Sequence, residues 1–170
     1  MARTATSEVI DEEVDWDKKT TILSKTDHRG IIEYCNEGFC EVSGYTDEEL
    51  MGSNHNIVRH PDMPKVLFKV LWDCLKNSQP ISAIVKNKSK SGQYYWVQAQ
   101  FKTLISDGER YYFSVRTGVT TGQVAKVEGL YKKLLEIEIA EGTAQSEAFL
   151  LNFLKQNNTT YHELIQSILA

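Results

Sequence analysis

The stretch from residue 80 to residue 119 constrains the fold more than any other part of the chain. Three runs rich in β-branched and aromatic residues lie within it, at residues 80–88, 93–105 and 110–119. A Ser-Gly pair at residue 91 and an Asp-Gly pair at residue 107 separate these runs, and such pairs are typical of tight turns. The sequence therefore predicts three antiparallel strands joined by short turns.

Side chains alternate between the two faces of a strand, so the longest run also predicts which face is buried. We expect one set to line the inner, concave face of the sheet: Tyr95, Val97, Ala99 and Phe101. The other set shares the opposite face: Trp96, Gln98, Gln100 and Lys102.

Two more strands precede this meander. Residues 20–27 and 31–36 are β-rich on either side of a His-Arg-Gly turn, which predicts a hairpin. Five antiparallel strands with helices grouped in the middle of the sequence indicate an α+β fold.

Helix signals lie between the hairpin and the meander. Residues 37–45 form a short helix that Gly44 ends, and Thr46 with Glu49 makes a capping box for the next helix. Residues 64–77 give the strongest helix pattern, with one apolar stripe formed by Leu67, Leu71, Cys74 and Leu75. Phe68 and Trp72 form a second pair on a neighbouring edge, either as a pocket wall or as ordinary core aromatics.

The segment 54–64 crowds two histidines, an arginine, an aspartate and two prolines into a stretch that cannot be regular structure. Each proline disfavours the helical conformation for the residue before it, so the chain turns or runs extended here. Arg59 and Asp62 are three residues apart, with His60 between them. They can form a charge pair or present fixed donors to an anionic or heteroaromatic ligand. The alternative is an exposed loop whose charges face water.

Several motifs match a known family. They are the run Asn-Glu-Gly-Phe-Cys-Glu-Val-Ser-Gly-Tyr-Thr-Asp-Glu-Glu-Leu-Met-Gly from Asn36, Ile-Val-Arg-His-Pro-Asp-Met-Pro from Ile57, Trp-Asp at Trp72, and shorter matches at residues 84–87, 95–97, 115–117 and 127–131. Over roughly residues 20 to 131 the chain resembles the PAS sensory domain of the aerotaxis-receptor (Aer-like) family. The resemblance implies a PAS fold: a five-stranded antiparallel sheet, a pocket of short helices and a loop, and C-terminal helices. It also implies a non-covalently bound FAD whose redox state is reported to chemotaxis proteins.

The same resemblance implies six cofactor-binding residues: Asn36, Arg59, His60, Asp62, Trp72 and Asn87. Arg59 suits a phosphate or a carboxylate that shapes the loop, and the Asn87 amide can pair with both the N–H and C=O edges of a flavin. Trp72 would stack on the ring or line its slot.

Arg116 is a seventh candidate, chosen by its position on the last strand. In flavin-binding light sensors of the same fold, that strand carries a polar side chain near the reducible edge of the ring. A cation there favours the anionic reduced form and raises the potential. The alternative is that Arg116 points to solvent. The cysteine that such light sensors need is absent from the loop at 54–62, so no photochemical adduct is expected.

Composition narrows the function. The chain has 19 basic and 23 acidic residues, a net charge of −4 and no basic run, which disfavours nucleic-acid binding. Its apolar runs are far shorter than the ~18 residues that span a membrane, and we expect a cytoplasmic protein that its partner can recruit to the membrane. The three cysteines have no metal-site spacing and read as core residues.

No Ser/His/Asp, Cys/His or paired-carboxylate arrangement stands out, so we expect neither an enzyme nor a metal site formed by protein ligands alone. His55 and His60 leave a haem-binding PAS gas sensor as an alternative.

The chain divides into three parts. Residues 1–19 form a cap or a flexible tail, because the spacing of Ile10 and Val14 is helical within a polar, acidic stretch. Residues 20–120 form the PAS domain, and residues 121–170 form amphipathic helices for signal output or dimerisation.

The sequence therefore predicts an FAD-binding redox or oxygen sensor. It would signal to a separate methyl-accepting chemotaxis-type transducer, with residues 119–122 as the junction that responds. A cofactor-free PAS interaction module is the other alternative, in which the chain forms a homodimer through its PAS domain or its C-terminal helices.

Overall fold

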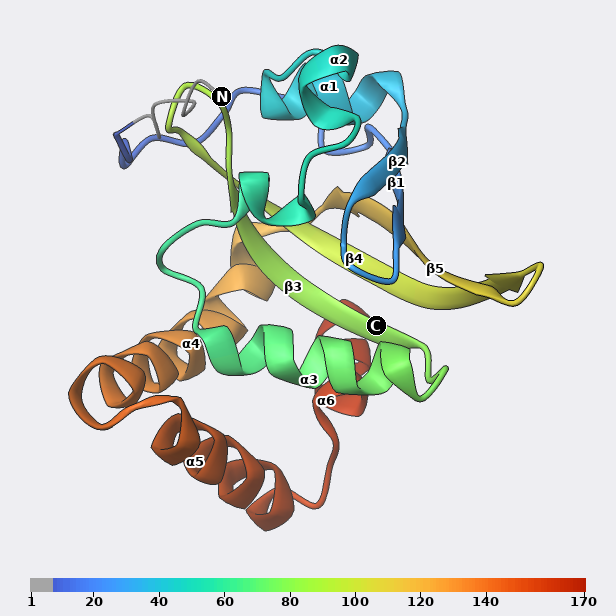
Figure 1. The fold of residues 1–170 in the computed structure, drawn as a ribbon. Helices are drawn as coiled ribbons and strands as arrows, with labels where there is room; N and C mark the ends of the chain where they lie inside the picture. Colours follow the sequence, from blue (N-terminus) through green and yellow to red (C-terminus); the bar gives the residue numbers. More distant parts are fainter. Residues whose placement is uncertain (1–7) are drawn as a thin grey trace.

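The computed structural model describes residues 8–170 and contains one five-stranded antiparallel sheet (Figure 1). Its strands are β1 (Ile22–Asp27), β2 (Ile32–Cys35), β3 (Ile81–Lys88), β4 (Tyr94–Ser106) and β5 (Glu109–Gly118). Their order is β2-β1-β5-β4-β3, so the N-terminal hairpin pairs with the last strand and β3 lies at an edge. This arrangement confirms the predicted hairpin, the meander and the α+β class.

Four helical elements connect β2 to β3 and cover the inner face of the sheet. They are α1 (Glu37–Ser43), α2 (Asp47–Leu50), the 3-10 helix η1 (His55–Val58) and α3 (Lys65–Lys76). The predicted end signals are confirmed: Gly44 ends α1 at φ 75°, and Thr46 with Glu49 forms the capping box of α2. The α3 stripe is buried at Leu67, Leu71 and Leu75, which fixes that helix against the core.

The predicted helical cap near the N-terminus is wrong for the residues that the structure describes, and residues 1–7 lie outside them. Residues 8–19 run largely extended beside the start of β4. Ile10 N donates to Gly92 O at 2.9 Å and Val14 N to Tyr94 O at 2.8 Å. The backbone groups of this segment form hydrogen bonds with free groups at the start of β4. A short isolated helix would be only marginally stable in water, so the extended form is favoured.

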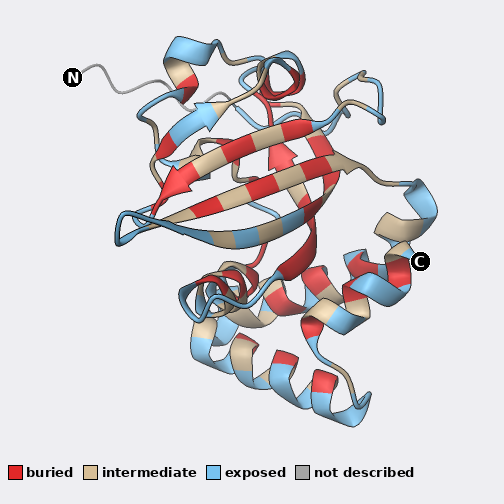
Figure 2. Cartoon of the chain, turned by 90° about the vertical axis from the view of Figure 1, so that its right-hand side faces the viewer, coloured by how far each residue is buried: buried red, intermediate tan, exposed pale blue. Residues whose placement is uncertain are grey.

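Three C-terminal helices fold back onto the domain: α4 (Thr121–Glu141), α5 (Thr143–Gln156) and α6 (Tyr161–Leu169). Buried residues run through the sheet and along one side of these helices (Figure 2). The Tyr131 hydroxyl of α4 donates to Ile84 O of β3 at 2.6 Å, and the His162 Nδ1 of α6 accepts from Ser82 N at 3.0 Å. These contacts cover the edge strand β3, which would otherwise expose unpaired backbone groups.

One apolar core joins the sheet to these helices, because Val127, Leu134, Leu150 and Ile165 belong to the same buried cluster as Ile22. The division at residue 121 into sensory and output parts stays a prediction. Across residues 8–170, every helix falls short of the length and apolar character that spanning a membrane requires.

Candidate functional site

A cavity lies between the inner face of the sheet, η1 and α3. Its walls are mainly apolar, and include Val58, Phe68, Leu71, Trp72, Val85 and Phe101. Phe68 and Trp72 come from the predicted second pair on α3, so the pocket-wall interpretation of that pair is confirmed. A few polar side chains from β1, β3, β5 and η1 reach the same space, as in small-molecule sites.

Arg116 is one of two arginines that line this cavity. Its side chain is almost fully buried, at 2% exposure, which rules out the solvent-facing alternative. Its Nη2 donates to the Ser24 hydroxyl and to His55 Nε2, the latter at 2.9 Å, while its Nε has no partner among residues 8–170. None of the ion pairs found within residues 8–170 includes Arg116. Burial lowers its pKa to about 10, so it stays charged at neutral pH.

His55 is held neutral beside this cation. Burial, and then the charge of Arg116, lower the pKa of His55 to about 3. A guanidinium can only donate, so His55 Nε2 must accept and the ring proton resides on Nδ1. The Ser24 hydroxyl lies 3.1 Å from the same Nε2. Ser24, His55 and Arg116 therefore form one network, without a carboxylate, that orients the guanidinium.

Arg59 is a second cation at the cavity. Its guanidinium stacks on Phe68 of α3, with 3.8 Å from Cζ to the ring centroid, and its Nε is buried without a partner. Burial lowers its pKa. The predicted pair of Arg59 with Asp62 does not form, because Lys86 Nζ lies 2.8 Å from the Asp62 carboxylate and takes it instead. The guanidinium of Arg59 is therefore free of a carboxylate in the described chain.

Asn87 and Trp72 complete the set of predicted site residues that line the cavity. Asn87 is 5% exposed, and its backbone bridges to that of Arg59. Trp72 closes the end near the β1–β2 turn, where its ring packs at 5.2 Å and 72° against Tyr112. A Cβ on Gly30 would lie 3.3 Å from Trp72 Cη2, so glycine lets this turn approach the indole.

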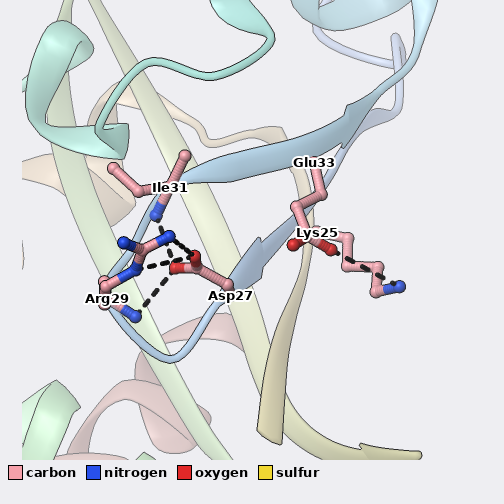
Figure 3. A network of polar contacts seen from close by, with 5 residues as sticks. All are labelled: Lys25, Asp27, Arg29, Ile31 and Glu33. Carbon is pink, nitrogen blue, oxygen red and sulfur yellow. Dashed lines mark hydrogen bonds and ion pairs between the residues drawn. The ribbon is translucent and has the colours of Figure 1, made fainter. Parts of the chain in front are cut away.

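The β1–β2 turn beside Trp72 is held by Asp27 (Figure 3). The carboxylate of Asp27 accepts from Arg29 N at 2.8 Å, from Ile31 N at 3.0 Å and from the Arg29 guanidinium. Desolvation acts to raise the pKa of Asp27, but these hydrogen bonds outweigh it and the pKa is lowered. The turn, and with it Gly30, is therefore fixed at neutral pH.

The other predicted site residues, Asn36, His60 and Asp62, do not line the cavity. Asn36 uses its amide to lock α1 onto β1: its oxygen accepts from Leu23 N and Phe39 N, and its nitrogen donates to Thr21 O. The buried His60 accepts from Asp62 N at 3.0 Å through Nδ1, and burial lowers its pKa. In this structure these residues shape the hairpin and the loop around the site.

Sequence reasoning missed the strand polar groups Ser24, Thr26 and Ser114. Ser24 pairs with Ser114 across β1 and β5, and both are nearly fully buried. Within the described part of the chain, the Ser114 hydroxyl has no hydrogen-bond partner. The signal was present as polar residues two apart on otherwise apolar inner faces, Ser24 with Thr26 and Ser114 with Arg116. Polar groups on a buried strand face indicate a binding site when they remain unsatisfied.

The sheet order, the helical cover of its inner face and the cavity define a PAS sensory domain. The PAS fold family matches residues 32–116, which is half of the chain, and the chain belongs to this family. Solved structures agree on the fold: the PAS domain of a Colwellia psychrerythraea protein matches with a TM-score of 0.55 at 16% identity, over 59% of this chain and 87% of that one. A fungal LOV domain photoreceptor matches with a TM-score of 0.51 at 20% identity, over 65% and 83%.

Within the family, the chain is 47% identical over 116 residues to the aerotaxis receptor of Escherichia coli, which covers 68% of this chain and 23% of that receptor. A blue-light photoreceptor of Listeria innocua is 29% identical over 108 residues, covering 63% of this chain and 42% of its own length. A nitrogen fixation regulatory protein of Klebsiella pneumoniae is 24% identical over 90 residues, covering 53% and 18%. The chain thus spans less than half of each of these relatives, and its resemblance to the Aer-like PAS domain is confirmed.

The lowered pKa of His55 predicts a pH-dependent stability. The unfolded chain binds a proton at His55 below its ordinary pKa of 6.5, whereas the folded protein does not until about 3. His55 therefore gives the free energy of unfolding no pH dependence above pH 6.5. Below pH 6.5 this free energy falls with the pH, by up to about 1.4 kcal/mol per pH unit. Urea unfolding from about pH 7 to about pH 5 should show this slope in the wild type. His55→Asn should make the slope shallower, although His60, whose pKa is also lowered by burial, keeps part of it. Equal slopes in both proteins would contradict the assignment.

Proposed function

We propose that this chain is the flavin-binding sensory domain of an energy-taxis sensor, with FAD held non-covalently in the cavity. The observation that carries the proposal is Arg116, a buried cation that has no carboxylate partner in the described chain and faces an apolar cavity. A buried charge of this kind is costly unless something compensates it. The electron-rich edge of a flavin is such a partner, and the resemblance to the Aer-like family points to the same group.

The residues present fit a flavin. An isoalloxazine needs an apolar slot, a few donors and acceptors for its pyrimidine edge, and positive charge for the diphosphate. Phe68, Leu71 and Trp72 would form the slot. The unsatisfied Ser114 hydroxyl, the Asn87 amide and the free Arg116 Nε would serve the polar edge, and Arg59 would serve the phosphate side.

FAD supplies a redox centre whose charge and hydrogen bonding change on reduction. Arg116 places a positive charge in a low-dielectric space, which favours a more negative partner and raises the potential. The network with Ser24 and His55 holds the guanidinium in one orientation, so a change in its partner must alter these hydrogen bonds. Arg116 is thus the residue that would sense the change.

The route to the output helices is short. Arg116 lies on β5, which ends at Gly118, and the Thr120 side chain caps the N-terminus of α4. Gln98 of β4 donates to Gly118 O at 3.1 Å, which ties the neighbouring strand to this junction. We infer that residues 119–122 are the two-state element and that α4 carries the signal to a methyl-accepting chemotaxis-type transducer on a separate chain. In this proposal the domain signals and catalyses no reaction.

The haem alternative finds less support in the cavity. His55 lies there, but its Nε2 accepts from Arg116, and a cationic metal beside a buried guanidinium is unfavourable. His60 lies outside the cavity and binds its own loop through Nδ1. The cofactor-free alternative leaves the charge of Arg116 uncompensated. The colour of the purified protein separates these functions: yellow for flavin, red for haem and none for an interaction module.

Removing a polar group of the site should release the flavin. Asn87→Ala and Arg59→Ala each delete a group worth ~1–3 kcal/mol, so we expect FAD affinity to fall about fivefold or more. Binding is measured by quenching of flavin fluorescence, with circular dichroism to establish folding. Asn152→Ala and Lys155→Ala, on exposed positions of α5, are the matched controls and should bind normally. Unchanged affinity in both site variants would contradict the assigned pocket.

The proposed output route predicts a redox-dependent change in α4. Hydrogen exchange of FAD-loaded protein, compared between the oxidised and the dithionite-reduced state, should differ across residues 119–141. Residues of α5 that face solvent serve as the internal reference. Identical exchange across α4 in both states would remove this helix from the signalling route.

A further inference from the structure

A groove adjoins the cavity at Arg59. It is bounded by the N-terminal segment at Val9, by the loop at Arg59 and Lys65, and by the end of α4 at Leu135 and Ile139. Arg59 lines both this groove and the internal cavity. A ligand that extends past Arg59 would therefore pass from one into the other.

Three cations face this groove: Arg59, Lys65 and Lys88. None of them takes part in an ion pair formed within residues 8–170, although Lys88 is only 8% exposed. Two carboxylates, Glu8 and Glu138, also line the groove, so its cations outnumber its carboxylates by three to two. Asp62 pairs with Lys86, and Glu138 accepts from Lys65 N at 3.1 Å and Val66 N at 3.4 Å, where it caps α3. The groove thus keeps a positive charge that an anion can neutralise.

Apolar side chains stand exposed beside these cations. Ile139 of α4 is 78% exposed and Val9 is 42% exposed, and both line the groove with Leu135 and Met63. An aliphatic side chain that stays this exposed contributes little hydrophobic free energy to folding, because its surface is not buried. An adenosine diphosphate group needs an apolar surface for its purine and hydrogen-bond donors for its phosphates. The aliphatic side chains of the groove offer the first and its cations offer the second.

We propose that this groove holds the ADP half of FAD, an inference that rests on the proposed function. Arg59, at the junction, together with Lys65 and Lys88, binds the diphosphate, and the adenine packs on Ile139 and Val9. The consequence is specificity for the dinucleotide over shorter flavins. A second consequence is that the N-terminal segment and α4 both touch the cofactor, so an output helix contributes directly to cofactor retention.

The test compares the dissociation constants of riboflavin, FMN and FAD, measured by fluorescence quenching. The variants are Lys65→Glu and Ile139→Asp, at exposed positions whose replacement leaves the core intact. Their matched controls are Lys132→Glu on α4 and Leu151→Asp on α5, which lie outside the groove. We expect FAD to bind the wild type at least about tenfold more tightly than riboflavin, and each groove variant to weaken FAD about fivefold or more. Riboflavin binding should stay unchanged in all of them.

The outcomes separate the two proposals. Equal affinity for riboflavin and FAD, or FAD affinity that neither groove variant lowers, would overturn the ADP site while the ring site in the cavity stands. An equal loss of riboflavin binding in the groove variants would also overturn it, because the effect would then lie on the ring. If none of the three flavins binds the wild type, the proposed function itself fails, and the ADP site with it.

Discussion

The candidate site depends on a guanidinium that is buried without a counter-ion among the described residues. Arg116 points from β5 into the cavity and is held by Ser24 and His55, two neutral groups. A carboxylate there would satisfy the charge, but it would also repel an electron-rich ligand. The buried charge of Arg116 also affects its neighbour His55. Burial and this charge together keep His55 neutral far below its ordinary pKa. The arrangement gives up stability for a site that is complete only with a ligand.

Around this point, tertiary contacts tie the loop, α3 and the output helices together. α3 begins after Pro64, and its own sequence offers no side-chain cap. Glu138 of α4, which lies 73 residues beyond Lys65 in the sequence, supplies that cap. The Tyr131 hydroxyl reaches Ile84 on β3, and its ring stacks on Trp96. A shift of α4 would therefore be felt at the N-terminus of α3 and at the loop that carries Arg59, so the site and the output helix are mechanically joined.

Local signals in the sequence predicted most of the fold. The alternation in β4, Gly44 at the end of α1 and the Thr46 capping box each depend on neighbours within a few residues, and all were found. The spacing of Ile10 and Val14 predicted a helix, but this segment is extended and pairs with the start of β4. β4 lies far along the chain, so no local pattern could indicate this pairing. The site was harder for the same reason. Arg59, Trp72, Asn87 and Arg116 lie in one cavity as predicted, but Ser24 meets Arg116 through the β1–β5 pairing and His55 reaches them from η1. The polar pattern on β1 marked Ser24 as unusual, but it could not show which distant residues Ser24 contacts.

The most direct test of this account measures the unfolding free energy of wild type and Arg116→Met, each with and without FAD. Without flavin, the account predicts that Arg116→Met is at least as stable as the wild type, because an uncompensated charge is replaced by an apolar side chain of similar length. With FAD, only the wild type should gain stability, by ~2.7 kcal/mol at a ligand concentration of about 100 times Kd. An Arg116→Met protein that is much less stable without flavin, yet gains as much from FAD as the wild type, would show that Arg116 is a structural residue and would contradict the account.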